Sequence, residues 1–201
     1  MQQSNNPVSP KDLVLDKTVA DENIGTKLAI KYPNSWTLAN SSSLNNPTGW
    51  DSESHTITSP DKEVSVEFHA WVNSGLGATY PAGATYQKLD DDFKIDGAPL
   101  YGFTTYVVRS NQNNQGDRYQ YFSGVYGVPS YTSAGVTLAM LDKNQYIGQT
   151  EANNNVATLK IKFNKLDKKK DLTPDDVSSA IATDNYKVAK SIVKSLHYKS
   201  E

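Results

Sequence analysis

The chain has 201 residues, which is enough for one domain with a substantial core and too few for two ordinary domains. Twenty Lys and Arg residues against 22 Asp and Glu residues give a net charge of −2, which excludes the basic surface that binding to nucleic acid or to an anionic membrane requires. The chain contains no cysteine, so disulfides, thiolate zinc sites, iron–sulfur clusters and a cysteine nucleophile are excluded as well.

The N-terminal segment before the predicted domain is polar and punctuated by proline. Residues 1–11 predict a flexible tether of the kind that follows the lipidated cysteine of a bacterial lipoprotein, although a disordered cytosolic tail would have the same composition. No stretch approaches 18 consecutive apolar residues, so we expect contact with a membrane only through such a lipid anchor. Residues 12–201 are expected to form a single extracytoplasmic domain at the bacterial cell membrane.

Most of the chain alternates apolar with polar residues, which predicts β-strands. Over residues 64–72 this alternation puts the apolar side chains on one face and Glu67, His69 and Trp71 on the other. Residues 86–95 instead predict one short helix. The predicted strands cover residues 27–32, 36–39, 56–58, 64–72, 101–109 and 118–126 (one long hairpin), 136–141 and 156–163.

The C-terminal segment changes to a helical period. Thr173 followed by Pro174 predicts the start of one helix, and Asp184 is expected to cap a second. The second helix carries an apolar stripe that needs a sheet to cover it: Val188, Ala189, Ile192, Val193 and Leu196. Many strands that end in helices indicate an α+β fold, with an antiparallel sheet of about six strands flanked by helices.

Two segments resemble the PsbP/Mog1-like family. The first is an apolar strand that runs into Tyr-Pro-x-x-Trp at residues 28–36, and the second is the end of the amphipathic helix at residues 192–196. The resemblance implies an antiparallel sheet between helices, and accessory, scaffolding or binding proteins that share no catalytic site. In that motif Tyr32 and Trp36 would be packing residues.

The three histidines do not stand in a pattern typical of catalysis or zinc binding. His55 is expected in a polar loop, His69 on an outward strand face and His197 at a helix end. His69 and Glu67 share a strand face and could hold a metal, but an ordinary surface pair is favoured. Because the glycine motifs of serine hydrolases and nucleotide sites are missing too, we predict no catalytic residue, no metal and no cofactor.

The densest acidic cluster is residues 90–92 with Asp96, and calcium is the cation that such a cluster suits. An EF-hand loop needs Gly at its sixth and Glu at its twelfth position, where this chain has Ile95 and Tyr101. A solvated surface is therefore favoured over a calcium site. The four lysines of residues 165–170 are interrupted by an aspartate, which favours a solvated turn over a polyanion site.

Aromatic residues are the one chemical surplus, with twelve tyrosines in the chain. Strand alternation places some of them in solvent, where tyrosine and tryptophan supply rigid contact area with polar handles. We predict ligand-binding residues at Trp71, Tyr119 and Tyr121, with packing within a half-buried sheet as the alternative.

Three functions remain compatible with the sequence. The favoured one is a monomeric, non-catalytic binding or adaptor domain of a lipoprotein, with a protein or glycan partner. A hydrolase that acts through paired carboxylates such as Glu67, Asp90 or Asp91 is the alternative from another class. A carrier of a small molecule or glycan would use the tyrosine-rich surface together with a pocket.

Overall fold

The computed structural model describes residues 13–26, 28–45, 51–71, 85–90, 93–95, 98–110, 117–126, 131–132, 135–136 and 156–199. The predicted tether lies outside these residues, as does most of the strand predicted over 136–141. Asp91, Asp92 and Asp96 also lie outside them. Within the described residues, no helix is both long enough and apolar enough to cross a membrane.

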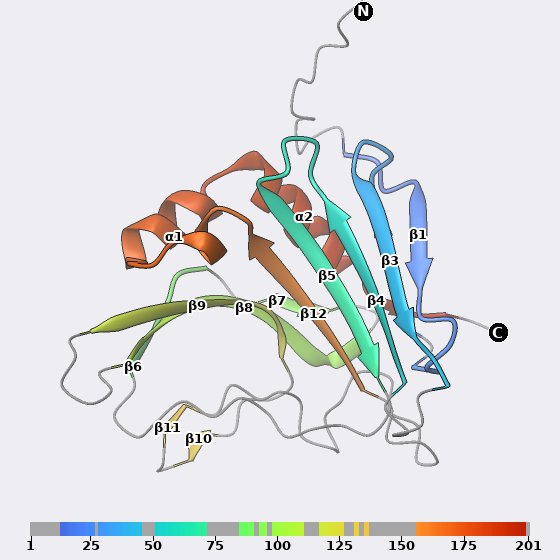
Figure 1. Ribbon diagram of the computed structural model, residues 1–201, viewed down its shortest axis with the longest axis horizontal. Helices are drawn as coiled ribbons and strands as arrows, with labels where there is room; N and C mark the ends of the chain where they lie inside the picture. Colours follow the sequence, from blue (N-terminus) through green and yellow to red (C-terminus); the bar gives the residue numbers. More distant parts are fainter. Residues whose placement is uncertain are drawn as a thin grey trace, which may run out of the picture.

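Antiparallel strands make up most of the fold (Figure 1). They are β1 (Lys17–Ala20), β2 (Leu28–Tyr32), β3 (Thr37–Ser43), β4 (Ser52–Thr58), β5 (Val64–Trp71), β6 (Thr85–Lys88), β7 (Phe93–Ile95), β8 (Ala98–Ser110), β9 (Arg118–Tyr126), β10 (Tyr131–Thr132), β11 (Gly135–Val136), β12 (Val156–Phe163) and β13 (His197–Tyr198). The large sheet has eight strands in the order β3-β4-β5-β12-β9-β8-β6, with β7 paired to β8 beside this path. A small sheet has the order β1-β2-β13, and β10 pairs with β11.

The helices α1 (Pro174–Ile181) and α2 (Asp184–Lys194) follow the short 3-10 helix η2 (Leu166–Lys168), and α2 packs against β5, β12 and β2. We call the face of the large sheet under α2 the helix face and the opposite one the far face. The predicted apolar stripe is confirmed, since its members are all buried: Val188, Ala189, Ile192 and Val193 on α2, and Leu196 just after its end. The predicted inward residues of β5 and β12 are buried as well: Val64, Val66, Phe68, Ala70, Leu159, Ile161 and Phe163.

The α+β class with an antiparallel sheet is confirmed, but the sheet is larger than the six strands expected. The helix predicted over residues 86–95 is wrong, because this segment forms β6 and β7 along the edge of the long strand β8. The helical spacing of apolar residues in this segment is outweighed by the backbone hydrogen bonds that it makes with the 13-residue strand β8. This addition accounts for the larger sheet.

Two local predictions need correction. The second helix is capped by Thr183, whose side chain accepts a hydrogen bond from the Tyr186 N–H, and Asp184 is the first helical residue. His55 lies on β4 rather than in a loop, and it is only 4% exposed. At the first helix the prediction is confirmed, since Thr173 forms a capping box with Asp176.

Candidate functional site

The large sheet splits between β9 and β12. These strands pair at one position, where Lys160 lies opposite Gly124, and beyond it they diverge (Figure 1). A Cβ atom on Gly124 would lie 2.8 Å from the carbonyl oxygen of Leu159 and 3.0 Å from the ring of Phe122. Because real Cβ contacts are longer than this, the lack of a side chain lets the two strands approach at this point.

Tyr121, three residues before Gly124 on β9, spans the gap between β9 and β12. Its hydroxyl oxygen accepts a hydrogen bond from the Phe163 N–H at 2.9 Å, and its O–H donates to Asp167 Oδ1 at 2.5 Å. The Tyr121 and Phe163 rings are also in contact, tilted by 54° with centroids 5.3 Å apart. Burial, followed by the hydrogen bond to Asp167, raises the pKa of Tyr121 well above its usual value. The hydroxyl therefore keeps its proton and acts as a tie between strands.

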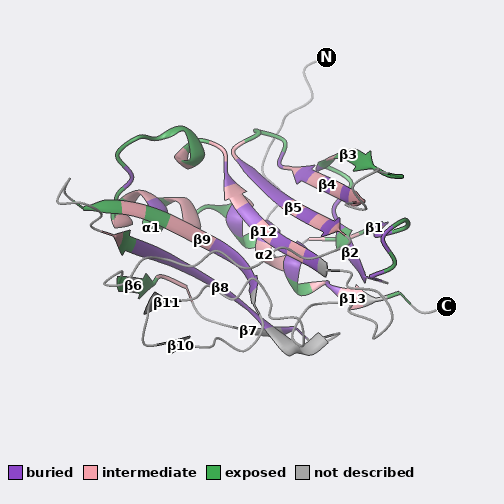
Figure 2. Ribbon diagram, turned by 60° about the horizontal axis from the view of Figure 1, so that its bottom comes forward, coloured by how far each residue is buried: buried purple, intermediate pink, exposed green. Residues whose placement is uncertain are grey.

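An open groove of about 900 Å³ extends from this tie between the start of β9 and the loop that leads from η2 to α1. Figure 2 shows the loop as a largely exposed arch near the exposed end of β9. The backbone of residues 164–173 makes no backbone hydrogen bond to β9. The residues that line this β9 groove are Asp117, Arg118, Tyr119, Gln120, Tyr121, Leu166, Asp167, Lys169, Lys170, Asp171, Leu172 and Thr173.

Most charges at the rim of the β9 groove are neutralised locally. Asp117 pairs with Arg109 at 2.7 Å, and Lys169 pairs with Asp176 at 2.7 Å. The lysine, followed by the Thr173 cap, lowers the pKa of Asp176 to about 2.

Two neighbouring rim residues differ from these. Lys170 and Asp171 are exposed and form no ion pair with any residue that the structure describes. They therefore present one charge of each sign to a ligand.

The three predicted binding residues do not form one site. Residues directly opposite in an antiparallel pair share a face, so Gly124, Lys160 and Glu67 all lie on the far face. Alternation from Gly124 puts Tyr119 and Tyr121 on the helix face, and both line the β9 groove. Trp71, four residues beyond Glu67, is on the far face and lies opposite Val156 at the other end of β12. All three side chains are half-buried, and ligand binding by them stays a prediction.

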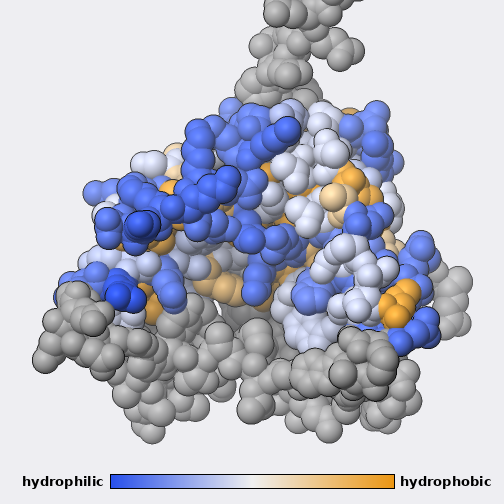
Figure 3. Space-filling view, viewed as in Figure 1, coloured by the Kyte–Doolittle hydropathy of each residue, from blue (hydrophilic) through white to orange (hydrophobic). Residues whose placement is uncertain are grey.

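The surroundings of Trp71 are those of a mixed sheet surface. The His69 ring contacts the Trp71 ring, tilted by 40° with centroids 4.9 Å apart. Burial, followed by the positive charge of Lys160, lowers the pKa of His69. Figure 3 shows the described surface over β4, β5 and β12 as mostly hydrophilic, with apolar residues only scattered across it. Strongly apolar residues therefore form no continuous patch on the described surface over these three strands.

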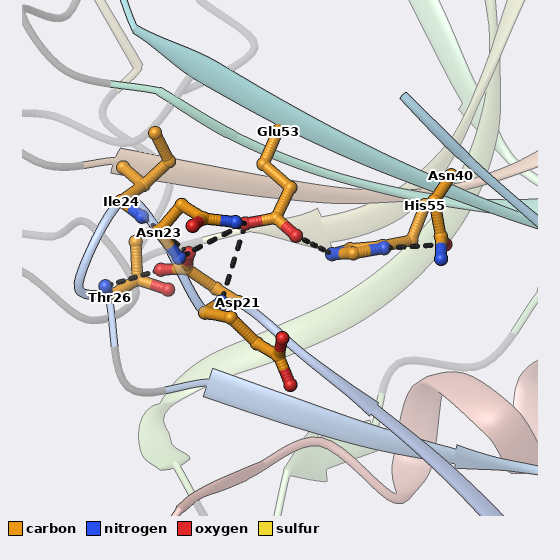
Figure 4. Close-up of polar contacts among 8 residues, drawn as sticks. Asp21, Asn23, Ile24, Thr26, Asn40, Glu53 and His55 are labelled. Carbon is orange, nitrogen blue, oxygen red and sulfur yellow. Dashed lines mark hydrogen bonds and ion pairs between the residues drawn. The ribbon is translucent and has the colours of Figure 1, made fainter. Parts of the chain in front are cut away.

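A second polar cluster, missed by the sequence analysis, is buried between β4 and the loop of residues 21–26 (Figure 4). Glu53 Oε2 accepts hydrogen bonds from the N–H groups of Glu22 and Asn23 and from the Asn23 side chain, at 3.1 to 3.3 Å. Asp21 accepts from the N–H groups of Asn23, Ile24 and Thr26 at 2.5 to 3.2 Å. The two carboxylates thus hold the backbone of this loop.

His55 completes this cluster. Its Nδ1 lies 2.9 Å from Asn40 Oδ1. Its Nε2 lies 3.2 Å from Glu53 Oε1, which is close enough for an ion pair, but the angles do not form a hydrogen bond. Asp21, Glu53 and His55 are each less than 8% exposed, so no substrate reaches their polar atoms. The sequence signal that could have located this cluster is strand alternation, since Glu53 and His55 lie on the same face of β4 as the buried Ile57. We interpret this cluster as structural.

The remaining acidic candidates are also committed to local partners. Glu67 pairs with Lys162 at 3.1 Å on the far face. Asp90 accepts hydrogen bonds from the Tyr186 hydroxyl at 2.6 Å and from Lys190 at 2.7 Å, on the side of α2. Glu67 and Asp90 therefore do not face one cleft, while Asp91 lies outside the described residues. Among the residues described, no group of three or more His, Asp or Glu side chains could hold a metal ion.

Comparison with known proteins identifies no relative: no family model, no curated protein and no solved structure matches this chain.

Proposed function

We propose that this protein is a non-catalytic binding domain and that the β9 groove is its ligand site. The observation that carries the proposal is a groove of about 900 Å³ that opens where the sheet splits, a volume within the range of known ligand sites. Two of the three residues predicted to bind a ligand, Tyr119 and Tyr121, line it.

The chemistry of the groove favours binding over turnover. The Tyr121 hydroxyl is engaged on both sides and, with its raised pKa, does not supply a base. The carboxylate of Asp167 is occupied by Tyr121 and lies 3.4 Å from Lys162. These groups hold the walls in place, and the exposed charges of Lys170 and Asp171 remain for ligand contact.

The proposal also includes the family and the location expected from the sequence. A PsbP/Mog1-like accessory domain, tethered outside a bacterial membrane by a lipidated cysteine, would need a surface groove rather than an enclosed active site. The gene sequence that precedes Gln2 tests the location, since a Leu-x-x-Cys motif supports it and its absence contradicts it.

The groove can be tested with a label, because the chain has no native cysteine. A fluorophore on Lys168→Cys, an exposed position of η2 beside the groove loop, reports on the groove, and the same fluorophore on Ser41→Cys, at an exposed position of β3, is the control. Both labelled proteins are exposed to a displayed random-peptide library and to a glycan array. We expect a captured ligand to change the emission of the first label and to leave the second unchanged.

A charge reversal provides the matched variants. Asp171→Lys should weaken the captured ligand by about tenfold, whereas Asp16→Lys, an exposed aspartate outside the groove, should leave its affinity within about twofold. Equal affinities for the two variants, or a label change at Ser41→Cys alone, would overturn the groove as the binding site.

A further inference from the structure

The ligand class follows from which polar groups the β9 groove leaves unused, so the inference rests on the proposed function. An interior strand of a sheet hydrogen-bonds on both edges, but β9 pairs with β8 along its length and with β12 only at Gly124. Between residues 119 and 121, no described strand pairs with the groove edge of β9, and the loop opposite makes no backbone hydrogen bond to it.

The split leaves an edge in the middle of the sheet. Every second residue of a strand directs its N–H and C=O to a given side, so residues 119–121 turn alternate backbone groups toward the groove. Across the gap, the Phe163 N–H is satisfied by the Tyr121 hydroxyl in place of a β9 carbonyl. Thus β12 has a substitute partner at this point, whereas this edge of β9 has no backbone partner among the described residues.

The side chains of the groove argue against a sugar as the occupant. Sugars stack on the open face of an aromatic ring, but the rings of Tyr119 and Tyr121 are half-buried and pack on the apolar cluster of Val107, Leu172 and Val177. The Tyr121 hydroxyl is engaged at both of its hydrogen-bonding positions as well. The groups that remain for a ligand are a strand edge, the exposed side chain of Gln120 and the two opposite charges of Lys170 and Asp171.

We infer that the ligand of the β9 groove is an extended peptide segment of a partner protein, which adds as a strand to the edge of β9. Main-chain hydrogen bonds provide the affinity in this mode, and alternate side chains provide the specificity. Residues 119–121 span about 10 Å, so the register is fixed by about three peptide residues. Since Lys170 and Asp171 lie side by side on the loop wall, the preferred peptide carries charges of both signs near these residues.

The test places the perturbation in the ligand, so protein folding does not enter. A peptide selected from the displayed library against the wild-type chain is resynthesised with one N-methyl group at each position in turn. Strand addition predicts an alternating pattern, in which methylation at every second residue weakens binding by about tenfold and at the residues between by less than about twofold.

Hydrogen exchange provides the second readout. The bound peptide should slow exchange at alternate amides of residues 119–121 and leave those of β3, at the outer edge of the sheet, unchanged. A flat N-methyl pattern, or binding without added protection in β9, would overturn the peptide inference.

The outcomes also separate this inference from the proposed function. If a glycan but no peptide changes the emission of labelled Lys168→Cys, the groove is a binding site and the peptide inference is wrong. If the β9 amides become protected as protein concentration rises without peptide, the occupant is a second copy of this chain and the inference is again wrong. If neither peptides nor glycans change the emission, both proposals fail.

Discussion

Replacing Tyr121 by phenylalanine tests whether its hydroxyl ties the two halves of the split sheet together. The change keeps the ring, which contacts the Phe163 ring, and removes the oxygen that accepts a hydrogen bond from the Phe163 N–H at 2.9 Å. A partly buried N–H that loses its acceptor costs about 1–2 kcal/mol, and the exposed bond to Asp167 adds a few tenths at most. We therefore expect the free energy of unfolding to fall by about 1–2 kcal/mol.

Urea unfolding measures this loss as a shift of the midpoint at constant slope. Tyr119→Phe is the matched control, because Tyr119 lies two residues earlier on the same strand and its hydroxyl makes no hydrogen bond to a described residue. The control should change stability by less than about 0.5 kcal/mol. Equal losses in the two variants would refute the argument, because the hydroxyl of Tyr121 would then contribute no more than an ordinary half-buried one.

The dependence of folding stability on alkaline pH tests the role of the Tyr121 hydroxyl independently. The pKa of Tyr121 is raised in the folded state, so above about pH 10 the unfolded chain releases a proton that the folded chain keeps. The stabilisation is complete below the unfolded pKa and is lost as pH rises toward the folded one. Wild-type stability should fall above about pH 10, less steeply in Tyr121→Phe, and an unchanged slope in the variant would contradict the pKa assignment.

Four further tests probe the surrounding structure, the first three by the same unfolding assay and the fourth by NMR titration. Gly124→Ala should destabilise by about 1–2 kcal/mol because its Cβ meets a backbone carbonyl, and a neutral result would show that the strands can separate. Ile192→Ala should cost about 2–4 kcal/mol if α2 is docked, whereas a loss under about 0.5 kcal/mol would show that it is not. Glu53→Gln should cost about 2 kcal/mol, with faster amide exchange confined to Glu22 and Asn23, and normal protection there would reject the loop-holding role. Asp176 should titrate near pH 2 by NMR, with its stabilisation lost as pH falls from about 4 toward 2, and Lys169→Ala should move that titration upward.

The sequence alone determined the elements whose signals are local. Alternation of apolar with polar residues identified β5 and β12 and their buried faces, and a capping residue before proline identified the start of α1. These patterns are readable because a strand or helix with one buried face must repeat its apolar residues at its own period. The same reasoning found the stripe of α2, whose residues are all buried.

Only the tertiary structure decided the features that depend on pairing between distant segments. Residues 86–95 form strands because they pair with the edge of β8. Trp71 and Tyr121 lie on opposite faces of the sheet, because the pairing of Gly124 with Lys160 fixes which residues of each strand share a face. The register of these strand pairs cannot be predicted from one segment alone, since pairing depends on which strand lies alongside and at what offset. The β9 groove has the same origin, because one glycine brings two strands together at a single position and their divergence beyond it leaves an edge without a strand partner at residues 119–121.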